Sequence, residues 1–387
     1  MSISRRHFLT HASAAAALSV VGGRSARSLA FGDGAAHGRA EKAPFPYVDG
    51  LSFLGPDAPL SASGLSGVIW DVSDIEPVKE VPAGTAPRFV RSFDACARSI
   101  TAKRRTLSAG KIPGGFLATR GSDIRKAYDR GETAVFFQFQ GADPLGDDLR
   151  RLDLFYELGL RILQITHHNN NAWGGGALER EAIGLTKLGA EGVERLNTLG
   201  IIPDLAHVGD VTALDVLKIS KKPVIVSHGG ARALVNNARC TPDSVIKGVA
   251  DSGGMMGIFM MSFWLTEDPV PNAESYLRQI AHVIKVGGID AVGIANDFGI
   301  VGVPAANEPG MTNEKMARGY DRWWNGVANE GILGFDKRPM HVVIPELNDV
   351  RRTFKIHAAL ERAGYKAAEI EKIMGGNWIR VLTSTLG

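Results

Sequence analysis

The sequence predicts an α/β protein whose main domain is a closed (β/α)8 barrel, the TIM-barrel architecture. From about residue 45 onward, short apolar runs alternate with helix-like stretches, and about eight such units follow one another. Continuous apolar strands between helices are typical of a parallel sheet that is buried on both faces. Eight units favour a closed barrel over an open sheet.

Eight apolar runs are expected as the barrel strands. In chain order they are residues 47–54, 67–74, 133–140, 161–168, 201–207, 223–228, 255–263 and 290–298. Amphipathic stretches between them are expected as helices, at residues 147–159, 186–200, 211–220, 242–254 and 273–288. The chain after residue 340 predicts two closing helices.

The N-terminal segment is interpreted as a targeting sequence. Arg5 and Arg6 precede an alanine-rich apolar run that is too short to span a bilayer permanently, and residues 28–30 offer small side chains for cleavage. The pattern resembles a twin-arginine signal, which exports folded proteins from bacteria. We therefore expect residues 1–30 to be a signal peptide, residues 31–44 a linker, and residues 45–387 a single domain located in the periplasm or secreted.

The charge balance argues against a nucleic-acid partner. The formal net charge is +3, but residues 1–30 contribute four arginines and no acidic residue, so the mature chain carries −1. No basic stripe remains for a phosphate backbone. The two cysteines, Cys96 and Cys240, are too few for a disulfide framework or a cysteine-based zinc site.

Polar side chains follow consecutive predicted strands. They are Gln140, His167, His168, His207, His228 and Asp297. The carboxyl ends of barrel strands converge on one mouth, where the chemistry of such folds takes place. The chain has ten histidines, and every histidine within a predicted strand stands at its end. Neutral imidazole suits zinc and similar ions, and a carboxylate such as Asp297 can complete a site or accept a proton.

These residues lie within motifs that resemble the membrane (renal) dipeptidase family, zinc metallopeptidases of the amidohydrolase-like barrel superfamily. The similarity runs through "ITHHNNNAWGGG", "IIPDLAHVGD", "PVIVSHGGARAL", "GIANDFG" and the terminal "GGNWIRVL", so it covers nearly all of residues 45–387. The resemblance implies a barrel of the metal-dependent hydrolase type and cleavage of a dipeptide or related amide.

The resemblance also implies roles for individual residues. His207 and His228 match the two histidines that bind the family's second zinc. His167 matches the histidine that contacts the substrate or intermediate, and Arg239 matches the arginine that holds the substrate carboxylate. Asp297 matches the aspartate that takes the proton from the attacking water.

The departures from the family pattern concern the first zinc. The family's opening motif supplies a histidine and an aspartate where this chain has Leu51 and Phe53, and its bridging glutamate falls on Gln140. Cys240 replaces the asparagine that follows the arginine. An aliphatic or phenyl side chain cannot donate a lone pair, so the paired-zinc site cannot form as the family builds it.

Two interpretations stay open. In the first, one zinc ion remains on His207 and His228, with Gln140 or water as a further ligand, and Asp297 and His167 serve hydrolysis. In the second, the barrel is inactive or repurposed, holds no ion, and binds a carboxylate-bearing ligand through Arg239 or performs other chemistry. His168 is interpreted as a loop residue beside the site. After removal of the signal no transmembrane anchor is expected, and a homodimer is possible.

Overall fold

The computed structural model describes residues 42–78, 89–302, 333–335 and 342–387. The predicted signal peptide and most of the predicted linker lie outside these residues. Among the described helices, none is long and apolar enough to cross a membrane.

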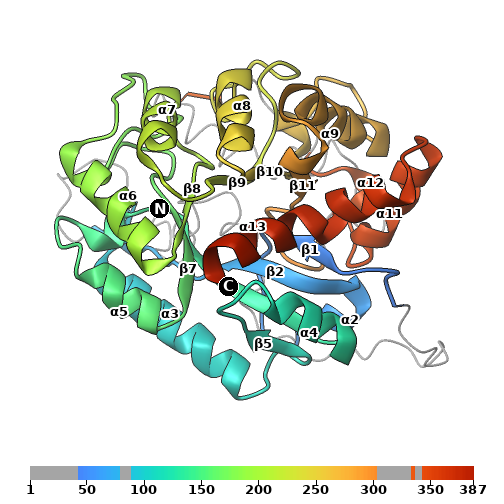
Figure 1. The fold of residues 1–387 in the computed structure, drawn as a ribbon, viewed down its shortest axis with the longest axis horizontal. Coiled ribbons are helices and arrows are strands. Elements are labelled where there is room, and N and C mark those ends of the chain that lie inside the picture. Colours follow the sequence, from blue (N-terminus) through green and yellow to red (C-terminus); the bar gives the residue numbers. More distant parts are fainter. Residues whose placement is uncertain (1–41, 79–88, 303–332, 336–341) are drawn as a thin grey trace, which may run out of the picture.

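The structure confirms the predicted barrel. Eight parallel strands follow one another around the ring in the order β1-β2-β6-β7-β8-β9-β10-β11 (Figure 1). Their bounds are Tyr47–Asp49, Leu65–Asp71, Thr133–Phe139, Leu160–Gln164, Ile202–Asp204, Ile225–Gly229, Met255–Ile258 and Val292–Ile294. Each of the eight runs expected from the sequence overlaps one of these strands.

Backbone hydrogen bonds between the first and last strands close the ring. The amide of Gly50 donates to the carbonyl oxygen of Ile294 at 3.0 Å, and the amide of Asp297 donates to Leu51 O at 2.8 Å. A further bond runs from Phe53 N to Phe298 O at 2.9 Å. The chain that follows β1 is thereby held against the chain that follows β11, which places residues 50–53 beside Asp297.

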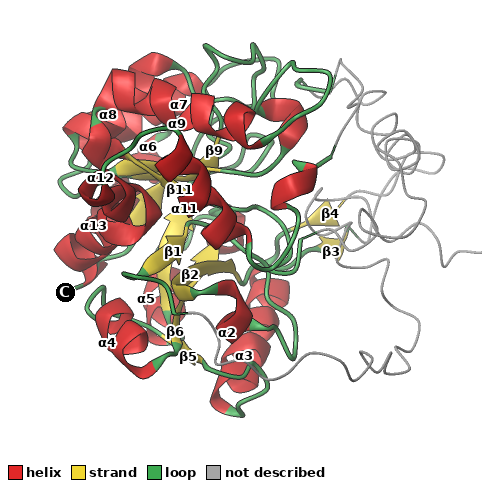
Figure 2. Ribbon diagram, turned by 90° about the vertical axis from the view of Figure 1, so that its right-hand side faces the viewer, coloured by secondary structure: helices red, strands yellow, loops and turns green. Residues whose placement is uncertain are grey.

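Helices enclose the strands, as the side view in Figure 2 shows. Their bounds are Leu60–Ser63 (α2), Phe93–Ser108 (α3), Asp123–Arg130 (α4), Arg151–Glu157 (α5), Lys187–Leu199 (α6), Asp210–Ile219 (α7), Asp243–Asp251 (α8), Ala273–Gly287 (α9), Arg352–Arg362 (α11), Ala367–Glu371 (α12) and Asn377–Leu386 (α13). A π-helical turn, Lys372–Gly376, joins α12 to α13. The larger apolar core lies between these helices and the sheet.

Three short strands were not predicted from the sequence. Strand β5 (Gly115–Leu117) pairs in parallel with the first half of β6, while β7 pairs with the second half. Strands β3 (Glu76–Pro77) and β4 (Phe89–Val90) form a separate antiparallel pair. None of the three is a continuous buried run, which is why the apolar pattern did not reveal them.

The barrel interior changes from apolar to polar along the strands. One end is filled by a second apolar cluster to which the strands contribute Val48, Ile69, Phe136, Ile162, Ile202, Ile225 and Met255. Two residues further along five of these strands, the inward positions are polar: Asp71, Gln138, Gln164, Asp204 and Ser227. Since alternate residues of a strand face the same side, these polar groups form a buried layer directly beneath the strand ends.

Helix α13 lies across the apolar end of the barrel (Figure 1). Its Trp378 is fully buried, and the indole Nε1 donates to Ile294 O at 3.1 Å. A Cβ atom at Gly257 or Gly293 would lie 2.9 or 2.7 Å from the indole, so glycine is needed where the ring enters. With this end closed, the opposite mouth is where a ligand can enter.

Candidate functional site

The ends of β8 and β9 bring two histidines together. His207 and His228 are buried, and their Nε2 atoms lie 2.9 Å apart. Strand β8 ends at Asp204 and β9 contains His228, and these two strands are neighbours in the sheet. The two residues predicted to share an ion therefore occupy one place at the mouth of the barrel.

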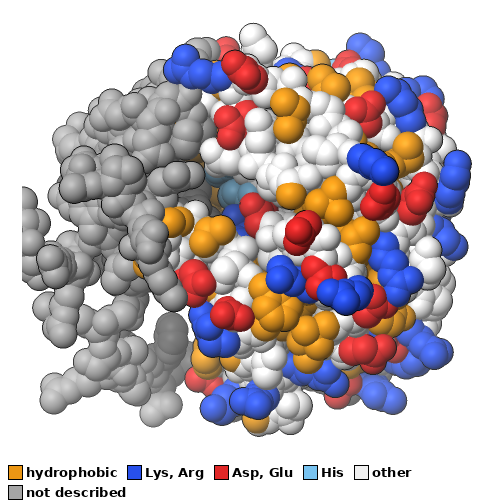
Figure 3. Space-filling view, turned by 90° about the vertical axis from the view of Figure 1, so that its left-hand side faces the viewer, with side chains coloured by type: hydrophobic (Ala, Val, Ile, Leu, Met, Phe, Trp, Pro, Cys, Tyr) orange, Lys and Arg blue, Asp and Glu red, His pale blue; other side chains and the backbone are white. Residues whose placement is uncertain are grey.

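The end of β7 adds two more imidazoles. His167 stacks on His207 with ring centroids 4.3 Å apart, and His168 lies 4.7 Å from His207 and 4.1 Å from His167. Histidine side chains are visible at the bottom of a hollow in Figure 3. Four imidazoles thus gather where three consecutive strands end, and His168, expected beside the site, lies in contact with His167 and His207.

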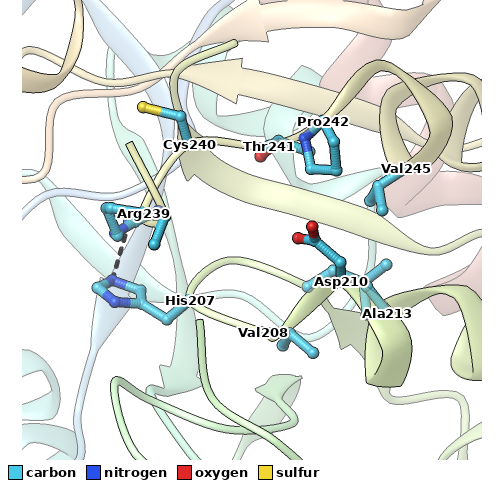
Figure 4. Close-up of a pocket in the computed structure, with 11 residues that line it drawn as sticks. His207, Val208, Asp210, Ala213, Arg239, Cys240, Thr241, Pro242 and Val245 are labelled. Atoms are coloured by element: carbon cyan, nitrogen blue, oxygen red, sulfur yellow. Dashed lines mark hydrogen bonds between the residues drawn. The ribbon is translucent and has the colours of Figure 1, made fainter. Parts of the chain in front are cut away.

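Arg239 joins this cluster from the segment between β9 and α8. Its Nη2 lies 2.9 Å from His207 Nε2. The dashed line in Figure 4 marks this contact. The guanidinium is buried beside the stacked aromatic rings of Phe259 and Trp264, at 5.2 and 5.6 Å from their centroids. Such cation–π contacts fix its direction. The Nε atom of Arg239 is buried without a hydrogen-bond partner, so part of its donor capacity is free for a ligand.

Asp297 stands at the same mouth, after β11. Its Oδ1 lies 3.9 Å from His228 Nε2, and its Oδ2 is buried without a partner. Burial is the main cause that raises the pKa of this carboxyl to about 7; Arg239 opposes the shift, and the charges of Asp71 and Asp49 add to it. A carboxyl group that titrates near neutral pH is suited to accept a proton during catalysis.

The backbone is unusual at two of these positions. Among the described residues other than glycine, positive φ angles occur at Asp57, His207 and Asp297, with φ of 62° at His207 and 66° at Asp297. Left-handed conformations of this kind cost free energy and cluster at functional sites. Here the left-handed turn occurs at the two residues whose side chains meet at the mouth.

The buried polar layer fixes the ring of His228. Ser227 Oγ donates to Asp204 Oδ2 at 2.6 Å and lies 2.8 Å from His228 Nδ1. Asp204 also accepts the amides of Ala206 and Ser227 and the Nε2 of Gln138, so its two oxygens face four donors. The hydroxyl proton of Ser227 therefore goes to Asp204, and Ser227 Oγ accepts the proton on His228 Nδ1.

This arrangement leaves two acceptor nitrogens facing each other. With the proton on Nδ1, His228 presents a lone pair at Nε2. His207 Nε2 accepts from Arg239, so it is also an acceptor. Burial holds the pKa of both imidazoles well below the usual range, and Arg239 lowers both further, so neither ring readily takes a second proton. The two acceptor nitrogens lie 2.9 Å apart, and a cation can bind both of them once Arg239 releases the single lone pair of His207 Nε2.

These residues fit one metal ion. Tetrahedral zinc with two imidazole ligands separates the nitrogens by about 3.3 Å, so a small shift of the rings and of Arg239 accommodates it. The family's first metal position does not fit, because the side chain of Leu51 is fully buried and has no donor atom. The backbone of Leu51 is engaged on both sides: its carbonyl oxygen accepts the amides of Asn296 and Asp297, and its own amide donates to Asp49 Oδ1. Gln140 directly follows β6, is buried, and offers a neutral amide.

The polar layer beneath the site was not predicted from the sequence. Asp204 and Ser227 stand inside apolar runs, and a carboxylate within such a run is the signal that points to a buried network. His168 was not predicted to be a ligand, although it directly follows His167. Both signals are present in the sequence. The residues that these side chains contact come from other strands, however, so the contacts become visible only in the folded structure.

Fold and site together define a (β/α)8 barrel with a histidine and carboxylate cluster at the carboxyl ends of its strands, as in barrel metallohydrolases. The family model described as membrane dipeptidase (peptidase family M19) matches residues 103–323, more than half of the chain. The chain belongs to the membrane dipeptidase family.

Individual relatives agree with this assignment. The chain is 30% identical over 273 residues to dipeptidase tcpJ of Claviceps purpurea (strain 20.1), a match that covers 69% of this chain and 54% of that relative. An amidohydrolase from Pseudomonas aeruginosa is similar in structure, with a TM-score of 0.72, 27% identity, and coverage of 89% and 97% of the two chains. A metallopeptidase from Rhodobacter sphaeroides, solved with a phosphinate mimic of the dipeptide L-Ala-D-Ala, shares the fold with a TM-score of 0.68 at 21% identity, covering 88% and 99%.

Proposed function

We propose that this protein is a dipeptidase-like metallohydrolase that cleaves an amide bond in a small carboxylate-bearing substrate with a single zinc ion. The observation that carries the proposal is the pair of acceptor nitrogens on His207 and His228, 2.9 Å apart and beside the buried carboxylate of Asp297. His207 and His228 would hold the ion, with Gln140 as a further neutral ligand.

The side chains around this position have different roles in the proposed hydrolysis. When an ion is held there, the chemistry that it supplies is Lewis acidity toward the carbonyl group and acidification of a water molecule. Asp297 accepts a proton from the attacking water, because its free Oδ2 and its raised pKa suit that task. As the C–N bond breaks, the same carboxyl group returns the proton to the departing amine.

Arg239 and His167 bind and orient the substrate. The guanidinium of Arg239 offers a free Nε donor beside the site, and a planar fork of donors suits a carboxylate. His167 is buried against His207 and directs its ring into the same space, where it can contact the carbonyl oxygen as negative charge develops.

The contact between Arg239 and His207 favours a second candidate function. Arg239 Nη2 already occupies the lone pair of His207 Nε2, and Leu51 and Phe53 supply no ligand. A protein with these features can bind a carboxylate-bearing ligand without hydrolysing it, or perform another reaction. This alternative predicts ligand binding that is independent of added metal.

The location of the protein is part of the proposal. The paired Arg5 and Arg6 and the apolar run after them support export by the twin-arginine route to the periplasm. That route carries folded proteins, so the metal site can be filled before export. A homodimer remains a prediction.

Dipeptide hydrolysis tests the proposed function directly. We expect zinc-loaded mature protein to hydrolyse members of a broad dipeptide panel and to lose activity at least about 100-fold on the same peptides with amidated C-termini, since Arg239 then lacks its carboxylate partner. His228→Ala should be inactive, while His282→Ala, a histidine on α9 that contacts Asp243, should match wild type. Metal-independent binding of intact dipeptides without any turnover would favour the second candidate.

Ser227→Ala tests the network that orients His228. Loss of the hydroxyl removes the acceptor that keeps the proton on Nδ1, so we expect zinc affinity to fall by roughly 10–100-fold. Ser227→Thr keeps the hydroxyl and should restore most of the affinity. Nitrogen-15 NMR of the metal-free protein provides a second measurement, with the His228 tautomer shifting toward Nε2–H in Ser227→Ala only. An unchanged tautomer and unchanged affinity would contradict this role.

A further inference from the structure

The end of β7 carries a histidine that the family resemblance does not assign. We propose that His168 is a metal ligand and that, together with the neighbouring histidines, it makes this site a nitrogen-dominated centre selective for zinc, copper or nickel over manganese and magnesium. The inference deepens the proposed function, because it specifies the donor set of the same site.

Geometry places His168 within reach of the site. One candidate ligand atom from each of His167, His168 and His207 lies within 4.8 Å of the others. The three rings are mutually close, with centroids 4.1 to 4.7 Å apart. His207 belongs both to this group and to the pair with His228. A ligand set that includes His168 therefore requires rotation of side chains and no rearrangement of the strands.

The backbone of His168 is held firmly. Its carbonyl oxygen accepts the amide of Leu178 at 3.1 Å, and a Cβ atom at Gly176 would lie 2.3 Å from that oxygen, so the loop packs tightly here. The ring also meets Phe335 at 6.3 Å in an edge-on contact. Strand β7 on one side and this loop on the other keep the imidazole at the mouth.

Oxygen ligands that the family uses for its first metal are missing around the same position, although the buried carboxylates of Asp49 and Asp71 lie close enough to act on Asp297. Leu51 and Phe53 stand where the family has a histidine and an aspartate, and Gln140 stands where it has a glutamate. The carboxylate of Asp297 is 3.9 Å from His228 Nε2. Loss of carboxylates together with an additional imidazole changes the chemistry of the donor set from mixed to nitrogen-dominated.

Donor type decides which ions such a site prefers. Imidazole suits zinc, copper and nickel, whereas carboxylate, carbonyl and water suit manganese and magnesium. The centre should therefore bind borderline ions selectively and discriminate strongly against hard ones.

The test measures metal binding without reference to turnover. Affinities for Zn²⁺, Cu²⁺ and Mn²⁺ are determined on metal-free mature protein, and nitrogen hyperfine lines in the electron paramagnetic resonance spectrum of the Cu²⁺ form count the imidazole ligands. We expect His168→Ala to lose one nitrogen and at least about tenfold in Zn²⁺ affinity. His282→Ala should change neither quantity. His168→Asp, which replaces the nitrogen donor with oxygen, should still bind and should shift the preference toward Mn²⁺.

The outcomes separate this inference from the proposed function. An unchanged nitrogen count and affinity in His168→Ala, or equal affinity of wild type for Mn²⁺ and Zn²⁺, would overturn the role of His168 and leave dipeptide hydrolysis untouched. Selective binding that depends on His168 in a protein inert toward dipeptides would support the inference and defeat the hydrolase proposal. A wild-type protein that binds none of the three ions would overturn both.

Discussion

Asp297→Asn is expected to lower kcat/KM by roughly 10²–10⁴-fold, the contribution that a positioned general base typically makes. Asparagine has nearly the same shape and leaves the backbone conformation unchanged, but it cannot accept a proton from water. The same substitution should raise the stability of the metal-free protein at neutral and alkaline pH, because it removes a buried carboxylate whose Oδ2 has no partner.

The pH dependence of that stabilisation follows from the pKa of Asp297. Its folded value is about 7 against an ordinary 3.8, so between these values the folded state holds a proton that the unfolded state has released. Stability therefore falls as pH rises through this window, by up to about 4 kcal/mol. Between pH 5 and pH 8 the stability of Asp297→Asn relative to wild type should increase by about 2–3 kcal/mol in urea titrations.

A surface carboxylate provides the matched control. Asp215 on α7 pairs with Lys218, and this hydrogen bond lowers its pKa. Asp215→Asn should therefore produce no stabilisation at pH 8. If the stability difference between Asp297→Asn and wild type were the same at both pH values, Asp297 would not be the buried, proton-holding group described here.

Gln140→Glu is expected to tighten zinc binding by roughly 10–100-fold. The substitution returns a negative charge to the position from which the family supplies its bridging glutamate, and a carboxylate is a stronger ligand than an amide. It should preserve or raise dipeptide turnover. Competition with a chelator of known affinity measures the change, and Gln140→Met, similar in size and without charge, should bind zinc no better than wild type.

The same variant distinguishes the two candidate functions. If wild type and Gln140→Glu both leave a broad dipeptide panel intact in the presence of zinc, while dipeptides still bind through Arg239, the hydrolase proposal fails. Binding or a different reaction would then be the function of the pocket.

The barrel was predictable from sequence because its strands are buried on both faces. Each is a continuous apolar run with a different pattern from the amphipathic helices around it, so all eight runs were recognised. The residues His207, His228 and Asp297 were predictable for a related reason. A polar side chain directly after a buried barrel strand lies at the mouth where the carboxyl ends of all the strands meet.

Contacts that depend on packing between distant segments were not predictable. Strand β5 is short and only half-buried, so no periodic signal identifies it. The partners of Asp204 come from β6 and β9, and the contact of Arg239 with His207 links a loop to the end of another strand. His168 illustrates the same limit, because the ring that it approaches belongs to a residue 39 positions away.

Metal stoichiometry tests the central claim most directly. Elemental analysis of purified mature protein, loaded with excess zinc and then desalted, should give one zinc ion per chain. The double variant His207→Ala/His228→Ala should retain none, while His282→Ala should retain one. Two tightly held ions in the wild-type protein, or one ion that survives in the double variant, would contradict a single site built on His207 and His228.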